Sequence, residues 1–371
     1  MSVIPPSTKI RAYIGTYTEG ILHVPHDNIA NSQGIYTALF DPMTGHFENL
    51  ELAAKTPNPS FLAKHAKLPI LYSVNECFME NFQCGGLSVF QIGLEGDLTL
   101  LDIFPTRGCA PCHLAIDPAG RFLLVSNYRD GRFVRFSLGQ DGLPCDNPLV
   151  FQSQGKGIHE KRQEGPHAHS MAIDPLTDDI LMVDLGTDTV YVRKFNERSN
   201  SYSNDARSDL KLSPGTGCRH LAFSRDAEAL YVVGELDSSV SVFLRDENGI
   251  LAGPIQSIST LPPDSDRIDT NTAAAILRHP SGQYIYVSNR GAGTVSVFRV
   301  DENHRLAYRG NCDVKCKTPR FCSLAPDAQY LVVCGQDAAS IETFRVDRES
   351  GRLSSCDIFL QVDSPVCVVY V

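Results

Sequence analysis

The chain carries a small set of side chains whose types suit proton transfer and anion binding, although they lie far apart in sequence. They are His167, His169, Arg219, Glu235, Arg290 and Arg320. An imidazole with a pKa near its usual ~6.5 exchanges protons close to neutral pH. A guanidinium group holds a carboxylate or a phosphate through paired hydrogen bonds. These residues can form one site only if the fold brings widely separated segments together.

A repeated pattern in the sequence indicates how this happens. An apolar run leads to a turn, and a β-rich run that ends in a polar residue follows it; each half occurs seven times. Six copies of the second half share an aliphatic position, with spacings of 52, 58, 49, 55 and 46 residues, at Leu71, Leu123, Leu181, Leu230, Ile285 and Leu331. A third β-rich run follows most copies, as at 86–90, 189–192, 239–243 and 294–298. Alternating β-branched and aromatic residues between glycine and aspartate are typical of strands.

Four strands that recur about every 50 residues predict an all-β protein, a seven-bladed β-propeller with four-stranded blades. The chain opens on a second-strand copy at 13–17 and ends on a first-strand copy at 366–369. We therefore expect the C-terminal strand to join the N-terminal blade and close the ring, so that residues 1–371 form a single domain. The polar segments 140–165, 197–209 and 262–272 are interpreted as surface loops. The tract 156–163 is most simply a solvated loop, but it leads into His167 and could fold over the ring.

The repeat also predicts which residues meet. In antiparallel neighbours, the residue that begins the first strand and the residue that ends the second lie at the same face. The innermost strands line a central channel, so these positions ring one of its openings. The first-strand positions are Ser60, Cys112, His169, Arg219, Ala274, Arg320 and Val366. The second-strand positions are Tyr17, Glu76, Tyr128, Leu185, Glu235, Arg290 and Gln336, and the residues before them are Thr16, Asn75, Asn127, Asp184, Gly234, Asn289 and Gly335.

These rings supply the candidate site residues. The candidate catalytic residues are His169, His167, Arg219, Glu235 and Arg290. The candidate substrate-binding residues are Arg320, His220, His113, Asn75, Glu76, Asn127, Tyr128, Asp184, Asn289 and Gln336. Any single asparagine or tyrosine among them is explained more simply as a structural group that solvates a strand end. The arginines need another explanation, because several cations at one opening repel one another unless Glu235 or an anion compensates them. In a chain of formal charge -10, such a cluster indicates a small anionic ligand.

Composition and missing motifs narrow the function further. Lys and Arg total 33 against 43 for Asp and Glu, which disfavours a general nucleic-acid binder. No apolar run approaches the ~20 residues of a membrane helix. Residues 1–6 show no export signal, so we expect a cytoplasmic protein whose twelve cysteines are reduced. We expect no metal and no cofactor, since Cys109 and Cys112 have no matching second pair and no phosphate-binding glycine loop is present. Protein partners are not predicted.

Several stretches resemble bacterial propeller-type 6-phosphogluconolactonases, in order and over nearly the whole chain. The most specific is Gly165-Pro166-His167-Ala168-His169. The others are 13–18, 34–36, 58–62, 184–188, 219–223, 287–290 and 364–367. The family has Gly-Pro-Arg-His where this chain has 217–220 with Cys218, and usually a glutamate where this chain has Ala275; the turn 279–282 also departs from the family.

The resemblance implies a seven-bladed propeller that hydrolyses a sugar-acid lactone, most simply 6-phosphogluconolactone of the pentose phosphate pathway. The family's proposed active-site residues, a histidine, two arginines and a glutamate, fall on the Gly-Pro-His-Ala-His histidines, Arg219, Arg290 and Glu235. His169 or His167 would accept a proton from water, Arg219 or Arg290 would stabilise the oxyanion, and Glu235 would orient an arginine or act as the base. Arg320 would hold the phosphate.

Two other functions stay open at this point. The family also includes fungal cyclases that act on 3-carboxymuconate, in which the same arginines would hold carboxylates while a histidine or glutamate moves a proton. A propeller can also serve as a scaffold that presents blade edges to protein partners, because a fold does not determine a function. Removal of the arginines would leave such a scaffold unaffected.

Overall fold

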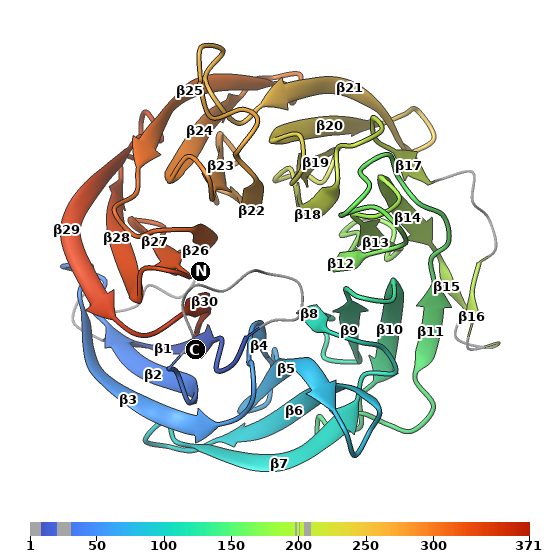
Figure 1. Ribbon diagram of the computed structural model, residues 1–371, viewed down its shortest axis with the longest axis vertical. Coiled ribbons are helices and arrows are strands. Elements are labelled where there is room, and N and C mark those ends of the chain that lie inside the picture. The colour runs from blue at the N-terminus through green and yellow to red at the C-terminus, as the bar shows by residue number, and fades with distance from the viewer. Residues whose placement is uncertain (1–8, 21–30, 197–198, 200, 204–208) are drawn as a thin grey trace.

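The computed structural model describes residues 9–20, 31–196, 199, 201–203 and 209–371. Seven four-stranded antiparallel sheets stand around a central axis like the blades of a propeller (Figure 1). The strands of each blade are named from the innermost to the outermost. Blade 1 contains β30 (Pro365–Tyr370), β1 (Ile10–Thr16), β2 (Gly34–Phe40) and β3 (Phe47–Lys55). Blade 2 contains β4 (Leu62–Lys64), β5 (Ile70–Met79), β6 (Cys84–Ile92) and β7 (Leu98–Pro105). Blade 3 contains β8 (Pro111–Ile116), β9 (Phe122–Asn127), β10 (Arg132–Ser137) and β11 (Leu149–Gln152).

The remaining blades follow in chain order. Blade 4 contains β12 (Ala168–Ile173), β13 (Ile180–Asp184), β14 (Thr189–Arg193) and β17 (Leu210–Lys211), with a small hairpin of β15 (Phe195–Asn196) and β16 (Ser201–Tyr202) beside it. Blade 5 contains β18 (Cys218–Phe223), β19 (Ala229–Gly234), β20 (Ser239–Arg245) and β21 (Leu251–Ser259). Blade 6 contains β22 (Ala273–Arg278), β23 (Tyr284–Asn289), β24 (Thr294–Val300) and β25 (Leu306–Asp313). Blade 7 contains β26 (Pro319–Leu324), β27 (Tyr330–Gly335), β28 (Ser340–Val346) and β29 (Leu353–Gln361).

The predicted architecture is confirmed, including the closure of the ring. The C-terminal strand β30 pairs antiparallel with β1, with Val368 opposite Ile14. Blade 1 is thus built from both ends of the chain, and β30 is its innermost strand. Every first-strand and second-strand copy identified in the sequence coincides with one of the two inner strands of a blade.

The apolar core is divided among the gaps between blades. Each of seven large clusters of buried apolar residues joins two neighbouring blades, for example Tyr286 of blade 6 with Leu331 of blade 7. The second strands, such as β9 and β23, are buried at every position because other strands and blades cover both of their faces. The outermost strands are more exposed, and in β25 partly buried residues alternate with exposed ones. Ring closure therefore completes the seventh core.

Two of the predicted loops contain strands. The segment 140–165 includes β11, the outermost strand of blade 3, and its later part turns in toward the channel. Most of the predicted loop 197–209 lies outside the described residues, as do residues 1–8 where an export signal was sought, but β16 falls within that loop. Strands of two to four residues are too short to show the alternating apolar pattern that identifies inner strands. The segment 262–272 is a loop, as expected.

The closing strand provides a first prediction. Val368 is 2% exposed and packs in the core between blades 7 and 1. Val368→Ala should lower the free energy of unfolding by about 2 kcal/mol through lost burial and a residual cavity. Val150→Ala, on the outer strand β11 where the side chain is 41% exposed, is the matched control and should change stability by less than about 0.5 kcal/mol. Chemical denaturation measures both, and equal effects would contradict closure by β30.

Candidate active site

The side chains that begin the innermost strands are aimed by β-bulges. The ladder register shifts between Ala168 and Ser170 in blade 4, between Cys218 and His220 in blade 5, and between Pro319 and Phe321 in blade 7. The residue left out of each ladder is His169, Arg219 or Arg320. A bulge bends the strand and redirects the extra side chain. The same irregularity in blades 4, 5 and 7 thus directs these residues to one opening of the channel, which we call the mouth.

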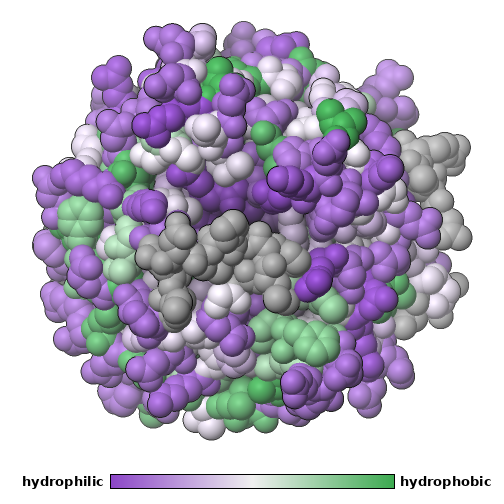
Figure 2. Space-filling view, in the orientation of Figure 1, coloured by the Kyte–Doolittle hydropathy of each residue, from purple (hydrophilic) through white to green (hydrophobic). Residues whose placement is uncertain are grey.

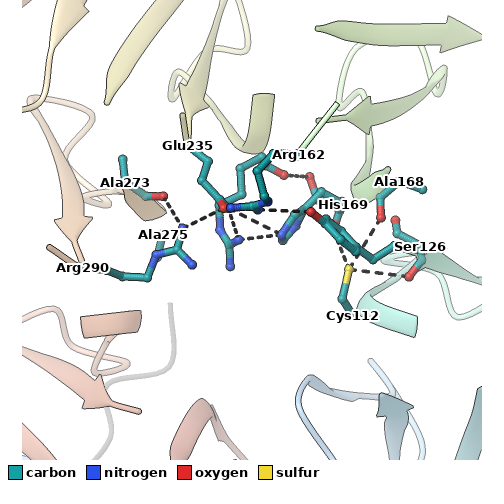
Figure 3. Close-up of polar contacts among 12 residues, drawn as sticks. Cys112, Ser126, Arg162, Ala168, His169, Glu235, Ala273, Ala275 and Arg290 are labelled. Carbon is teal, nitrogen blue, oxygen red and sulfur yellow. Dashed lines mark hydrogen bonds and ion pairs between the residues drawn. The ribbon is translucent and has the colours of Figure 1, made fainter. Parts of the chain in front are cut away.

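The centre of the mouth is the carboxylate of Glu235, which directly follows β19 and is fully buried. Its Oε1 accepts hydrogen bonds from Arg290 Nη2 at 2.9 Å and from Arg162 Nη2 at 2.5 Å. Its Oε2 accepts one from Arg219 Nη1. Figure 3 shows Arg162 and Arg290 directed toward this carboxylate from different parts of the ring. Burial alone would raise the pKa of Glu235, but Arg290, Arg162 and Arg219 together hold it well below its usual range.

His169 is locked into one state by Arg219. Arg219 Nη1 lies 2.6 Å from His169 Nε2, and because a guanidinium only donates, Nε2 must accept. Burial, followed by the charge of Arg219, lowers the pKa of His169 well below its usual value. The ring is therefore neutral at pH 7 and carries its proton on Nδ1. Burial also lowers the pKa of Arg219, to about 10, which leaves it charged.

Three buried nitrogens at this position lack partners among the described residues. They are Arg219 Nε, Arg290 Nε and His169 Nδ1. Each of them carries a proton in the states just derived, so each is an unused hydrogen-bond donor. Leaving a buried donor unpaired costs about 1–3 kcal/mol. Such donors clustered at one opening indicate a place where a ligand supplies the acceptors.

A second group lies on the side of the mouth formed by blades 7, 1 and 2. The Arg320 guanidinium lies 5.4 Å from the centre of the Tyr17 ring. Tyr17 Oη donates to Glu76 Oε2 at 2.9 Å. Among the described residues Arg320 forms no hydrogen bond and no ion pair. Burial raises the pKa of Glu76, although Arg320 opposes this. Among the described residues, four arginines accompany these two carboxyl groups, which gives this part of the mouth a surplus of positive charge.

Of the other predicted histidines, His167 and His113 lie beside this centre, whereas the His220 ring packs edge-on against His169 with ring centres 5.3 Å apart. His167 stacks on Tyr128 with ring centres 4.7 Å apart, and its Nδ1 lies 3.0 Å from the Tyr128 carbonyl oxygen. His113 and His220 belong to a cluster of rings on the channel wall, where their centres lie 5.4 Å apart and His113 lies 4.4 Å from Phe61. Burial lowers the pKa of His113 to about 3 and that of His220 well below its usual value.

Four predicted substrate-binding residues are not brought to the mouth. Their side chains have no exposed surface and are used inside the blades: they are Asn75, Asn127, Asp184 and Asn289. Asn75, for example, donates to Thr56 Oγ1 and to the Pro57 carbonyl, each at 2.8 Å. The reason is the pleat, because the residue before an inward-facing one points the opposite way. Gln336 bonds its neighbour Asp337 within blade 7.

Arg162 is a site residue that the ring argument missed. It lies in the segment 155–167, which connects β11 to β12 and which we call the strap. Besides Glu235, its Nη2 contacts Tyr128 Oη at 3.1 Å. The strap therefore folds over the mouth, which the sequence offered only as the second interpretation of 156–163. The one available signal was that this basic tract runs directly into His167.

The described residues contain no group of three or more His, Cys, Asp or Glu side chains arranged to hold a metal ion. Nor is any helix long and apolar enough to cross a membrane found in that part of the chain. On the face shown in Figure 2, hydrophilic residues predominate around a hollow near the centre of the ring. The mouth therefore offers guanidinium and imidazole nitrogens to a ligand.

A family model described as a lactonase with a seven-bladed β-propeller matches residues 11–370. The chain belongs to this lactonase family. It is 31% identical over 369 residues to 6-phosphogluconolactonase of Bacillus subtilis (strain 168), which covers 98% of this chain and 99% of the relative. It is 30% identical over 275 residues to 6-phosphogluconolactonase of Formosa agariphila, with 73% of this chain and 76% of the relative covered.

Solved structures of similar proteins superpose on nearly the whole chain. A periplasmic gluconolactonase of Pseudomonas aeruginosa superposes with a TM-score of 0.87 at 25% identity, covering 98% of this chain and 99% of the neighbour. A protein from Lactobacillus plantarum superposes with a TM-score of 0.86 at 30% identity, over 98% of this chain and all of the neighbour. The relatives named here as enzymes are hydrolases of cyclic esters, in agreement with the function class expected from the sequence. Since one neighbour is periplasmic, the cytoplasmic location stays a prediction.

The neutral histidines predict how stability depends on pH. A histidine whose pKa is lowered by folding binds its proton more tightly in the unfolded state, so stability is lost as pH falls below the unfolded value of ~6.5. His113, His169 and His220 each contribute up to about 1.4 kcal/mol per pH unit. The free energy of unfolding should therefore decrease steeply from pH 7 to pH 5. His220→Asn should reduce that slope by about one proton, whereas the exposed control His46→Asn should not; identical slopes would refute the assignment.

Proposed function

We propose that this protein hydrolyses a sugar-acid lactone, specifically 6-phosphogluconolactone to 6-phosphogluconate. The observation that carries the proposal is the composition of the mouth. Among the described residues, four guanidinium groups accompany two buried carboxyl groups there. Three buried N–H donors, on Arg219, Arg290 and His169, have no hydrogen-bond acceptor in that part of the chain. A substrate that combines a permanent anion with a carbonyl group that becomes negative in the transition state would use both features. The names of the relatives support the same reaction class.

The phosphate is assigned to Arg320. Its guanidinium has no carboxylate partner among the described residues and keeps its fork of donors for a ligand. The stacking of Arg320 on Tyr17, which is itself held by Glu76, restricts the arginine to one orientation. A pre-oriented guanidinium loses less entropy on binding a phosphate than a freely moving one.

The lactone carbonyl is assigned to the side chains around Glu235, across the mouth from Arg320. Attack by water turns this carbonyl oxygen into an oxyanion. Arg219 Nε and Arg290 Nε are buried donors of charged groups and have no partner in the part of the chain that the structure describes. Glu235 fixes both guanidinium groups, so their donors do not have to reorganise during the reaction. One well-placed donor of this kind contributes about 3–4 kcal/mol to transition-state stabilisation.

The proton acceptor is assigned to His169. Glu235 is a poor base, because three arginines occupy both of its carboxylate oxygens. The His169 Nε2 lone pair is occupied by Arg219 before substrate binds. Arg219 Nη1 also bonds Glu235 Oε2, so the guanidinium stays in place when His169 Nε2 exchanges this hydrogen bond for one with the attacking water. His167 is less suited, because its ring is stacked behind Tyr128.

Arg219→Ala tests the proposed chemistry. Loss of the oxyanion donor should lower kcat for 6-phosphogluconolactone about 100- to 1000-fold while the propeller stays folded. Base consumption in a pH-stat, corrected for spontaneous ring opening, measures the rate, and circular dichroism checks the fold. Activity of the wild-type protein on 3-carboxymuconate instead of the lactone would favour the cyclase. An unchanged lactonase rate in the variant would refute the roles assigned here.

Arg320→Ala tests the substrate. The variant should raise KM for the phosphorylated lactone by roughly 10- to 100-fold, as expected when a charged hydrogen-bond partner worth about 1.5–3 kcal/mol is removed. Its activity on unphosphorylated glucono-lactone should stay near that of the wild type. If both substrates lose activity equally, Arg320 does not bind the phosphate. Arg129 is exposed and is not one of the four arginines of the mouth. Arg129→Ala is therefore the control for a general change in charge.

A further inference from the structure

The strap brings a guanidinium to Glu235 that no inner strand provides. Arg162 reaches Glu235 Oε1 and Tyr128 Oη through its Nη2 atom alone. Its side chain is 36% exposed, against 4% for Arg219 and 15% for Arg290. Arg162 is thus the outermost of the three arginines around this carboxylate. Its Nε and Nη1 donors form no hydrogen bond with the described residues and are open to a ligand in the mouth.

The position of Arg162 depends on its neighbour Gln163, which is completely buried. Gln163 Nε2 donates to the Leu185 carbonyl oxygen and to Asp188 Oδ1, each at 2.8 Å. Its Oε1 accepts from the backbone nitrogen of His159 at 3.2 Å. Its backbone closes a turn of the strap, with its nitrogen bonded to the His159 carbonyl at 2.8 Å and its carbonyl accepting from Gly157 at 3.0 Å. Gln163 therefore fastens the strap to blade 4.

The anchor of the strap is shared with the active site. Asp188 lies in the turn between β13 and β14 and is 6% exposed. Besides Gln163, it accepts hydrogen bonds from the backbone nitrogens of Gly215 at 2.8 Å and Gly217 at 2.6 Å. Gly217 stands two residues before Arg219. One buried carboxylate thus fixes both the strap that carries Arg162 and the segment that leads into Arg219.

We propose that Arg162 contacts the substrate at the lactone end of the mouth and that Gln163 is its positioning residue. The identity of the ligand in this inference rests on the proposed function. Without the Gln163 anchor, Arg162 would be a long exposed side chain on an open loop and would lose conformational entropy on binding. With the anchor, the strap presents the guanidinium beside Glu235 before a ligand arrives. Gln163 touches no ligand itself.

A double-mutant cycle tests this dependence. The variants are Arg162→Ala, Gln163→Met, which keeps the volume but removes the hydrogen bonds, and the combination of the two. Arg162→Ala should lower kcat/KM about 10- to 100-fold for the phosphorylated and the unphosphorylated lactone alike, because it acts at the lactone end. Gln163→Met should lower it about 10-fold through the same contact. In the Arg162→Ala background, Gln163→Met should have no further effect.

One control lies on the strap and the other directly before it. Lys161→Ala removes a neighbouring exposed charge, and Gln154→Ala removes an exposed glutamine; both should stay within about 3-fold of the wild type. Thermal unfolding identifies any variant that does not fold. If the effects of Gln163→Met and Arg162→Ala multiply, Gln163 does not act through Arg162. If Arg162→Ala stays within 3-fold of the wild type, Arg162 does not contact the substrate.

A binding measurement separates this inference from the proposed function. Isothermal titration calorimetry with 6-phosphogluconate repeats the cycle without any reaction. A wild-type protein that hydrolyses neither lactone would refute the proposed function, while a non-additive binding cycle would still support the role of Gln163. Additive losses in binding by an active wild-type enzyme would refute the positioning role alone. If Arg162→Ala no longer distinguished the phosphorylated from the unphosphorylated lactone, while Arg320→Ala still did, Arg162 would bind the phosphate and Arg320 would lie at the lactone end.

Discussion

The organisation of the mouth depends on one buried carboxylate. Glu235 neutralises guanidinium groups that come from the strap, from β18 of its own blade and from the end of β23 in the next blade. Isolated ions of this kind are costly to bury, and removal of one partner of a buried pair typically costs several kcal/mol. The arginines therefore require Glu235, and Glu235 requires the ring that brings blades 4, 5 and 6 together. Closure by β30, on the far side of the ring, completes the arrangement on which this contact depends.

The same backbone irregularity, used blade after blade, turns a repetitive fold into a site. His169, Arg219 and Arg320 each occupy a bulge at the start of an innermost strand. In a regular ladder each side chain would follow the pleat, and its direction would be determined by the alternation along the strand. The bulge frees one residue per strand from that alternation. The inner strands behind it stay fully buried and rigid, as β13 and β19 are, so the redirected side chains stand on a fixed base.

The sequence repeat was sufficient to predict the ring, its closure and the positions of His169, Arg219, Glu235 and Arg290 near one opening. Inner strands carry a strong apolar pattern, and ring closure follows from the order of the copies. The repeat could not predict the bulges, because they depend on hydrogen-bond register and not on residue type. It assigned Asn75, Asn127, Asp184 and Asn289 to ligand contact although the pleat turns them into the blades. Arg162 lies in a loop outside the repeat, so only tertiary contacts place it.

The charge balance of the mouth links folding to ligand binding. Among the described residues, four arginines around Glu235 and Glu76 leave an excess of positive charge. His113, His169 and His220 are neutral and add none. The folded chain without a ligand therefore contains mutually repelling cations and unpaired donors such as Arg219 Nε. An anion that binds there removes both penalties at once and stabilises the folded state by mass action. The contacts that would select an anionic lactone are thus the ones that leave the unliganded ring least stable, and the seven cores between the blades must offset that cost.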